Sequence, residues 1–394
     1  MIKKGFLWAH KWLGLISGIV VLIVSMTGCI YVFHDDIKLL VYPHKYYISQ
    51  TEKIYTQIQR RPLSLLIDEA EKSLGPGRKV SRVDLYPAPN RTWVFRSMET
   101  DPSSTFFWKY YRHYNRVFIN PFTGEVQAIE DSKSEFFQIV LQLHMNLLLG
   151  KTIGEPVVGG ATIVFIILLI SGLILWWPKK WNRKSLKRSF QLDKKAKWKR
   201  FNYDLHNVLG FYSLLFALIL CITGLVFAYP TFKKVYVDLF NQLPTCRNDT
   251  PRPVTKKWDV VVPQITDNTR DNALMYTLGQ HPQADMMSLR LRGADEPHHD
   301  IQVRLSRDKT SDFVWYYFDQ TTGQISKLTR GEELPPGDKL ASMNYDIHVG
   351  SIGGIWTKLL AFTISLICAS LPITGFVIWM NKRTKKKRRL VQST

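Results

Sequence analysis

The chain has 394 residues, 45% of them hydrophobic, and a formal net charge of +21 at pH 7. The length allows two or three domains. The charge does not indicate a nucleic-acid partner, because 21 of the 53 Lys and Arg residues fall in three short segments that contain only two acidic residues: 1–11, 179–206 and 381–394. In the rest of the chain 32 basic residues nearly balance 30 acidic ones, so no nucleic-acid-binding surface is expected there.

The hydrophobic residues gather in four windows that contain no Asp, Glu, Lys or Arg: 12–33, 157–177, 208–229 and 359–380. Each is close to the ~20 residues that a helix needs to cross a hydrocarbon core of ~30 Å. Helices of soluble proteins usually keep a polar stripe, which these windows lack. We therefore predict four transmembrane helices, at 12–34, 156–178, 207–229 and 355–380.

The three basic segments all fall on the same side of a four-span topology. Short segments rich in Lys and Arg face the cytoplasm. We therefore predict that residues 1–11, the loop 179–206 and the tail 381–394 are cytoplasmic and contact lipid headgroups. The longer segments 35–155 and 230–354 then lie in the periplasm. This topology predicts a protein of the bacterial inner membrane with both termini in the cytoplasm.

The two halves of the chain resemble each other. With a shift of 196 residues, "HKWLGLISG" at the start of the first span aligns with "HNVLGFYSL" at the start of the third. With a shift of 203, "ISGLILWW" at the end of the second span aligns with "ITGFVIWM" in the fourth. Matches in register indicate a duplicated unit. Because both halves have the same orientation, we predict two tandem repeats of helix, outside domain and helix about a pseudo-two-fold axis along the membrane normal.

Each predicted periplasmic segment has the pattern of a small α+β domain. In the first, "LSLLIDEAEKSL" has helical periodicity, and "KVSRVDLYP", "RTWVFRSM" and "NRVFINPFTGEVQAI" have the alternation of strands. In the second, "TRDNALMYTLG" is the helix, and "DMMSLRLRG", "DIQVRLS" and "FVWYYFDQTTGQISKL" supply strands. The predicted fold class is a membrane α-helical protein with two α+β extracytoplasmic domains, a shape that alone does not decide function.

Four of the ten histidines obey the repeat. His10 aligns with His206 at the cytoplasmic ends of the first and third spans, and His144 aligns with His348 at the outer approaches to the second and fourth. Across a two-fold axis the members of each pair can face each other. A metal between them would then have the bis-imidazole ligation of a b-type haem. From the residues alone, histidines of the membrane interface are an equally good interpretation.

Three further residues bear on this hypothesis. Gly14 and Gly210 lie one helical turn from the histidines of the first and third spans, where they leave space for a flat macrocycle or, equally, allow close helix packing. His34 ends the first span, and its counterpart in the repeat is Pro230. Without a histidine partner, His34 is either an interface residue or an additional haem ligand on the outer side.

These motifs resemble those of the PepSY-associated transmembrane proteins. The resemblance rests on "HKWLGLISGIVVLIVSMTGCIYVFHDDI", "LHMNLLLG", "GLILWWPKKW" and "FINPFTGEV", and it covers nearly the whole chain. The family includes inner-membrane ferric-siderophore reductases and other iron-regulated membrane proteins. The resemblance implies two periplasmic PepSY-like domains, four transmembrane helices and two b-type haems. On that pattern the implied haem ligands are His10, His206, His144 and His348.

The resemblance also implies a reaction. Electrons would move from the cytoplasmic side to the periplasm and reduce a ferric siderophore, which releases iron because Fe(II) is held weakly by hard oxygen ligands. No GxGxxG motif follows a predicted strand, so the expected electron donor is a quinol or a partner reductase. Aromatic and basic residues of the segment 106–116 are candidates for contact with an aromatic, anionic chelate. Two alternatives stay open: a non-enzymatic PepSY sensor or inhibitory module, and a transporter accessory protein.

Overall fold

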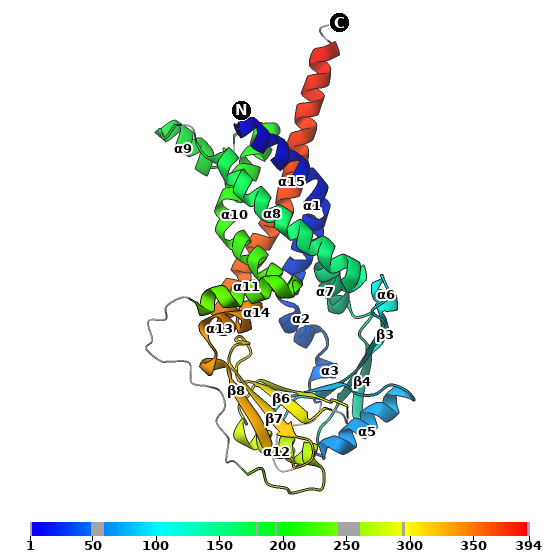
Figure 1. Cartoon of the computed structure of the whole chain (residues 1–394). Coiled ribbons are helices and arrows are strands. Elements are labelled where there is room, and N and C mark those ends of the chain that lie inside the picture. The colour runs from blue at the N-terminus through cyan, green and yellow to red at the C-terminus, as the bar shows by residue number, and fades with distance from the viewer. Residues whose placement is uncertain are drawn as a thin grey trace. The chain divides into compact units, whose positions relative to one another are not determined.

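The computed structural model (Figure 1) describes residues 2–48, 59–178, 180–193, 195–242, 261–293 and 296–391. The chain forms two compact units. The helical unit contains the described residues of Met1–Phe33, Val140–Lys233 and Ile347–Thr394. The sheet unit contains those of His34–Ile139 and Lys234–Asp346.

The helical unit is built from long apolar helices. Its elements are α1 (Ile2–Tyr31), the π-helix η1 (Gly150–Gly154), α8 (Glu155–Trp176), α9 (Arg183–Phe190), α10 (Trp198–Ala228), the 3-10 helix η3 (Ser351–Gly353) and α15 (Ile355–Val391). Among the described residues, four helices are long and apolar enough to cross a membrane: Lys3–Tyr31, Gly150–Trp176, Trp198–Ala228 and Ile355–Thr384. The prediction of four membrane helices is confirmed.

Helices α1 and α10 begin earlier than the predicted spans. Each starts eight residues before its histidine, so His10 and His206 lie about two turns inside their helices and not at the first turn. The apolar windows mark only the uncharged stretch, whereas the helix continues through polar residues that find partners. Asn202, for example, is buried and donates to the carbonyl oxygen of Thr374 at 3.1 Å.

The four spans pack around a common apolar core. Each of α1 and α10 contacts both α8 and α15. The buried side chains between them are Val21, Phe165, Leu168, Leu169, Ala217, Cys221, Ile364, Cys368 and Leu371. The middle of the helical unit is therefore closely packed and apolar.

Two short helices precede α8 and α15. Helix α7 (Phe136–Asn146) carries His144, and α14 (Asn344–Val349) carries His348. Both segments then turn through left-handed backbone: Leu147 and Leu148 have φ of 55° and 61°, and Gly350 has φ of 77°. Leucine rarely adopts this conformation, so its surroundings must hold the first of these turns. The turns set each histidine-bearing helix at a different direction from the span that follows it.

The sheet unit contains every strand predicted from the sequence. The strands are β1 (Arg82–Leu85), β2 (Trp93–Thr100), β3 (Tyr111–Ile119), β4 (Val126–Asp131), β5 (Met286–Arg290), β6 (His298–Arg304), β7 (Phe313–Asp319) and β8 (Ile325–Arg330). The helices are α2 (His34–Val41), α3 (Pro43–Tyr46), α5 (Leu63–Leu74), α6 (Phe107–Tyr110), α11 (Pro230–Asn241), α12 (Thr269–Gln280), η2 (Gly331–Glu333) and α13 (Pro336–Ser342).

The strands of both halves join in one antiparallel sheet. Its order is β4-β3-β2-β1-β5-β6-β7-β8. The sequence predicts two separate domains, 35–155 and 230–354, whereas in the structure β1 pairs with β5 and places Val83 opposite Leu289. If the two halves formed separate sheets, β1 and β5 would each be an edge strand with unpaired backbone N–H and C=O groups. Their pairing satisfies these groups in both strands.

Helices α5 and α12 cover one face of this sheet and contact each other. The core on this face includes Phe95, Ile119, Met287, Ile301 and Phe318. A buried carboxylate joins the two helices: Asp271 accepts hydrogen bonds from the backbone nitrogen and the hydroxyl of Ser64, at 3.0 and 2.6 Å. The opposite face of the sheet carries charged side chains.

Candidate functional site

Two histidines from different spans face each other in the helical unit. The ring centroids of His10 in α1 and His206 in α10 lie 6.4 Å apart, and the ring planes meet at 87°. The repeat in the sequence predicts this pairing, and the structure brings the two imidazoles together. We call these residues the first histidine pair.

A second pair lies beside the opposite ends of α1 and α10. The ring centroids of His144 in α7 and His348 in α14 are 6.0 Å apart, with an interplanar angle of 67°. The sequence predicts this pair as well. We call it the second histidine pair.

Neighbouring spans hold the first pair through the Nδ1 atoms. His10 Nδ1 lies 2.9 Å from Ser171 Oγ in α8. His206 Nδ1 lies 2.8 Å from Thr374 Oγ1 in α15. Helices α8 and α15 therefore fix the two imidazoles that α1 and α10 carry.

The second pair is held in the same way, but by α1 and α10. His144 Nδ1 donates to the carbonyl oxygen of Val24 at 2.9 Å and lies 3.3 Å from Thr27 Oγ1, both in α1. His348 Nδ1 lies 2.8 Å from Thr223 Oγ1 in α10. Each of these two helices thus carries one histidine and holds another.

The hydroxyl groups determine which ring nitrogen carries the hydrogen. Each of the four hydroxyls donates to a carbonyl oxygen of its own helix, as Thr374 does to Ser370 at 2.9 Å and Thr223 does to Ile219 at 2.8 Å. Once its single hydrogen is donated, a hydroxyl oxygen only accepts, so the imidazole Nδ1 is the donor. In a neutral imidazole the other nitrogen, Nε2, then keeps the lone pair that binds a metal.

One sequence pattern supplies all four of these environments. A backbone carbonyl contacts the ring, a hydroxyl follows three residues later, and a glycine follows after one more residue. A Cβ added at the glycine would lie 3.3 to 3.5 Å from the histidine Cε1. We call each set a cradle: Leu168, Ser171 and Gly172 for His10; Leu371, Thr374 and Gly375 for His206; Val24, Thr27 and Gly28 for His144; Leu220, Thr223 and Gly224 for His348.

The sequence predicts the histidines but not the cradles. The signal that reveals them is a Ser-Gly or Thr-Gly pair in every predicted span, at 27–28, 171–172, 223–224 and 374–375. The glycines that the sequence suggests instead, Gly14 and Gly210, lie against Leu168 and Leu371, with Cβ positions 3.8 and 3.7 Å from the leucine Cδ atoms. They serve close helix packing.

The two pairs are separated by most of the length of the spans. On α1, His10 precedes Val24, the residue that holds His144, by 14 residues, and α10 repeats this spacing from His206 to Leu220. At 1.5 Å per residue, 14 residues correspond to about 21 Å along each helix. Apolar side chains of the core occupy the middle of this interval.

The distance between the two ring centroids of each pair fits two imidazoles on one metal ion. A metal lies about 2 Å from an imidazole nitrogen, which places the centroids of two opposed rings about 6 Å apart. Within the described residues, no group of three or more His, Cys, Asp or Glu could hold a metal. A metal between two of these histidines therefore needs further ligands from a bound group. A haem would supply these further ligands as ring nitrogens, and the two histidines of a pair would hold its iron.

Burial keeps the imidazoles of the second pair neutral. It lowers the pKa of His348 to about 3, and the nearby His144 adds to this effect. Burial also lowers the pKa of His144. Both imidazoles are therefore neutral at physiological pH, as a metal ligand must be.

His34 begins α2 in the sheet unit. Its Nε2 lies 3.1 Å from the carboxylate of Asp35, and its ring centroid lies 6.5 Å from that of Phe137. Across the described ranges it takes part in no metal-binding group. The two interpretations of His34, an interface residue or an additional haem ligand, both stay predictions.

The segment 106–116 is used mostly for packing. Phe107 is buried, and Tyr111 stacks on Tyr114 with centroids 5.4 Å apart. Of its aromatic side chains, only Phe106 and Trp108 are about half exposed. Most of its aromatic groups are therefore not free to contact a chelate.

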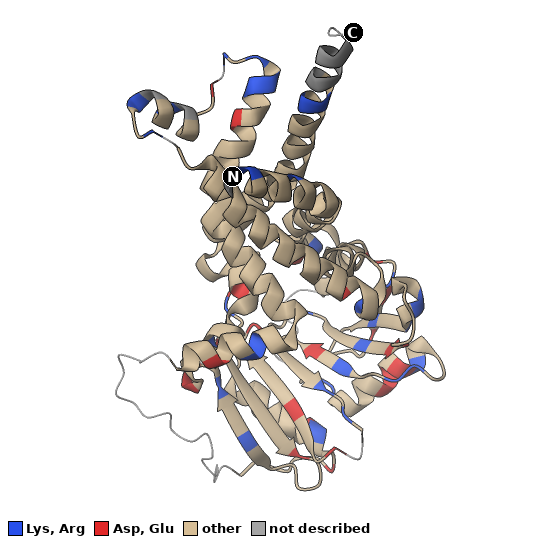
Figure 2. Cartoon of the chain, turned by 45° about the horizontal axis from the view of Figure 1, so that its top comes forward, with Lys and Arg blue, Asp and Glu red and all other residues tan. Residues whose placement is uncertain are grey.

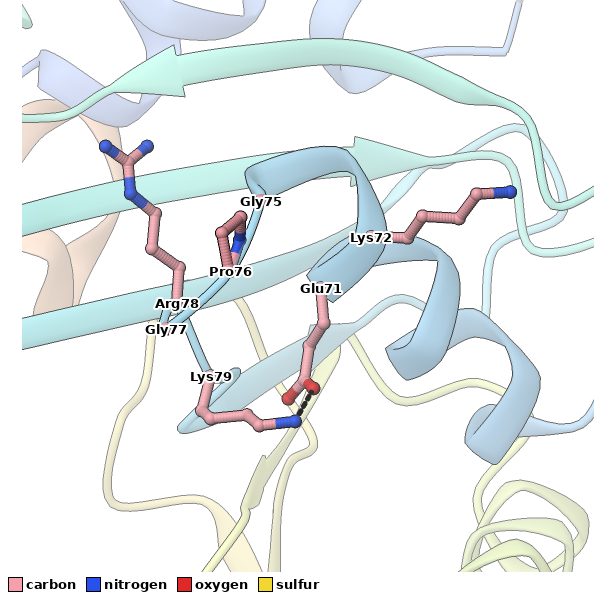
Figure 3. Close-up of a pocket in the computed structure, with 7 residues that line it drawn as sticks. All are labelled: Glu71, Lys72, Gly75, Pro76, Gly77, Arg78 and Lys79. Carbon is pink, nitrogen blue, oxygen red and sulfur yellow. Dashed lines mark hydrogen bonds and ion pairs between the residues drawn. The ribbon is translucent and has the colours of Figure 1, made fainter.

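A surface hollow lies at the C-terminal end of α5, in the sheet unit (Figure 3). It is lined by Glu71, Lys72, Gly75, Pro76, Gly77, Arg78 and Lys79. Lys79 Nζ and Glu71 Oε2 form an ion pair of 2.6 Å across it. It contains no histidine and no aromatic side chain, so we assign it no part in the functional site.

A comparison with protein families matches the chain over residues 7–382 to the model of the PepSY-associated TM region. The chain belongs to this family. The match includes both histidine pairs and all four cradles of this PepSY-associated protein. No curated protein matches the chain.

Replacing Gly172 by Val should destabilise the helical unit. A Cβ at this position lies 3.3 Å from His10 Cε1, so the larger side chain has to displace the imidazole. Overpacking of a filled site costs about 1–3 kcal/mol. Gly160, also in α8, has no atom within 4 Å of its Cβ position, and Gly160→Val is the matched control. Thermal unfolding in detergent should show a lower Tm for Gly172→Val alone, and equal Tm values would contradict the cradle.

Proposed function

We propose that this PepSY-associated membrane protein binds two b-type haems and carries electrons across the membrane. The observation that carries the proposal is the pair of opposed imidazoles at each end of the spans, at 6.4 and 6.0 Å between centroids. His10 and His206 would hold one haem, and His144 and His348 the other. Metal-ligating histidines usually donate their second ring N–H to a carbonyl or another acceptor. All four cradles supply such an acceptor.

The cradles prepare the ligands before any cofactor binds. The carbonyl and hydroxyl oxygens fix the rotation of each ring and make Nε2 more basic, while the glycine lets the neighbouring span approach the imidazole edge. A haem held between two such histidines supplies one-electron transfer. The apolar core between the pairs excludes water and charged solutes. This packing supports an electron carrier over a transporter.

We further propose that the electron acceptor is a ferric siderophore in the periplasm and that the donor is a quinol or a partner reductase. Membership in the PepSY-associated family and the two separated histidine pairs support this reaction. Hard oxygen ligands hold Fe(II) more weakly than Fe(III), so reduction of the chelate releases its iron.

Symmetry and orientation form part of the same proposal. The order of the strands reads as two copies of one half meeting at β1 and β5, and the contact of His10 with Ser171 recurs as that of His206 with Thr374. Both support tandem repeats about a pseudo-two-fold axis along the membrane normal. Basic residues gather at the end of the helical unit where α1 and α10 begin (Figure 2), and this supports the proposal that this end and the first histidine pair face the cytoplasm across the inner membrane.

The orientation predicts where fused reporters are active. A reporter that works only in the cytoplasm should be active when fused after Arg200, because this residue lies in the basic segment 179–206, in the first turn of α10 and before its apolar stretch. The same reporter fused after Thr123, in the turn between β3 and β4, should be inactive. Activity of the fusion at Thr123 without activity of the fusion at Arg200 would contradict the predicted topology and indicate the opposite orientation.

The reaction predicts reoxidation by the substrate. Purified protein reduced with dithionite and freed of excess reductant should be reoxidised by a ferric siderophore, and a ferrous-iron chelator should trap the Fe(II) that forms. Visible absorption follows the protein, and the chelator complex reports the iron. The gallium complex of the same siderophore is the matched control, since Ga(III) is not reduced under these conditions. Protein that stays reduced with a panel of ferric siderophores would contradict the reductase function and favour the sensor alternative.

A further inference from the structure

The sheet face opposite α5 and α12 carries a line of polar side chains across six neighbouring strands. Strand register places Arg116, Arg96, Arg82, Arg290, Asp300 and Tyr317 opposite one another in this order, from β3 to β7. The residues next to them, such as Val83 and Leu289, belong to the core on the other face. Figure 2 shows basic residues on the strands of the sheet. We call Arg96, Arg82, Arg290 and the adjacent Arg292 the arginine row.

Like charges in directly opposed positions destabilise a sheet. The first part of the row has one carboxylate to offset this repulsion. Asp84, only 1% exposed, accepts from Arg82 Nε at 3.0 Å and also pairs with Arg96. Removal of Arg82 would leave Asp84 paired with Arg96.

The second part of the row likewise has two arginines beside one buried carboxylate. Asp300 is 1% exposed and lies 2.6 Å from Arg292 Nε, a close ion pair. Arg290 is only 3.8 Å from the same carboxylate and stands directly opposite Arg82. Removal of Arg290 would therefore leave Asp300 paired.

The row is accessible to a ligand. The side chains of Arg82, Arg290 and Arg292 are 36%, 41% and 35% exposed. Partly exposed guanidinium groups can still donate to an anion, and they do so best to paired oxygen atoms.

A flat aromatic surface adjoins the row. The guanidinium carbon of Arg290 lies 4.9 Å from the ring centroid of Trp315. Trp315 in turn stacks on Tyr317, with centroids 5.6 Å apart and an angle of 12° between the rings. Both aromatic side chains are partly exposed. An aromatic ring of a ligand can stack here beside the positive charges.

We propose that the arginine row and the Trp315–Tyr317 stack bind a ferric catecholate chelate. Such a chelate combines several negative charges, paired oxygen atoms at its iron and flat aryl rings, and these match the guanidinium groups and the aromatic stack. A ferric trihydroxamate lacks the negative charge and the aryl rings. The inference rests on the proposed function for the nature of the substrate, and it adds the class of siderophore and the place where it binds.

Calorimetric titration of the full-length protein in detergent tests this site. The wild-type protein should bind a ferric tris-catecholate at least about tenfold more tightly than a ferric trihydroxamate, and added salt should weaken the tighter binding. Arg82→Gln/Arg290→Gln should weaken catecholate binding at least about tenfold, since both buried carboxylates keep another arginine. Arg307→Gln is the matched control: this arginine is 45% exposed, pairs with Asp36 outside the row, and its loss should change the affinity less than about twofold.

The inference is overturned if the wild-type protein does not bind the catecholate, prefers neither chelate, or binds it equally well after Arg82→Gln/Arg290→Gln. Should the double variant unfold, Arg290→Gln alone decides, because Arg292 still pairs with Asp300. Haem content and reoxidation by the trihydroxamate are measured on the same samples. A protein with haem that reduces the trihydroxamate but ignores the catecholate refutes only the arginine row, whereas catecholate binding by a protein without haem refutes only the proposed electron transfer.

Discussion

The hydrogen bond from the Nδ1–H of each paired histidine to an oxygen of a neighbouring span is the interaction on which the functional arrangement depends. It gives an imidazole in an apolar environment a partner for its N–H, and leaving that group unpaired would cost about 1–3 kcal/mol. The same bond leaves the Nε2 lone pair free. It also determines where the spans approach each other, because the glycine of each cradle lies against the ring edge.

The cradles link the two ends of the helical unit. Helix α1 carries His10 and supplies the cradle of His144, and α10 carries His206 and supplies the cradle of His348. Helices α8 and α15 supply the cradles of the first pair, and each follows a helix that carries a histidine of the second pair, with only the short helix η1 or η3 between them. Every span therefore contributes to the geometry of both pairs. A core of packed side chains between the pairs keeps this geometry rigid.

Much of this arrangement could be predicted from the sequence, for identifiable physical reasons. The apolar windows predict the spans because crossing a membrane requires a long uncharged stretch. The repeat predicts that His10 lies opposite His206, since duplicated units place equivalent residues at equivalent positions. The strands around Arg82 and Arg290 follow from local alternation.

The features that could not be predicted from the sequence depend on contacts between distant segments. The alternation in β1 does not specify β5 as its partner, so the joining of two predicted domains into one sheet could not be foreseen. For the same reason the alignment of Arg82 with Arg290 emerges only from the register. The roles of Ser171 and Thr374 also escape the sequence, because a hydroxyl within a span usually bonds to its own helix. These hydroxyls do that as well, and only the packing of the helices shows that each also accepts from a histidine.

The haem content of the purified protein and of its histidine variants tests the central claim most directly. Protein from haem-replete cells should contain two haems per chain with the low-spin absorption of bis-histidine ligation. His206→Ala and His10→Ala should each lose the same haem or convert it to high spin, His144→Ala and His348→Ala should do so for the other, and His34→Ala should keep both. A His206→Ala protein that retains two low-spin haems would contradict the account.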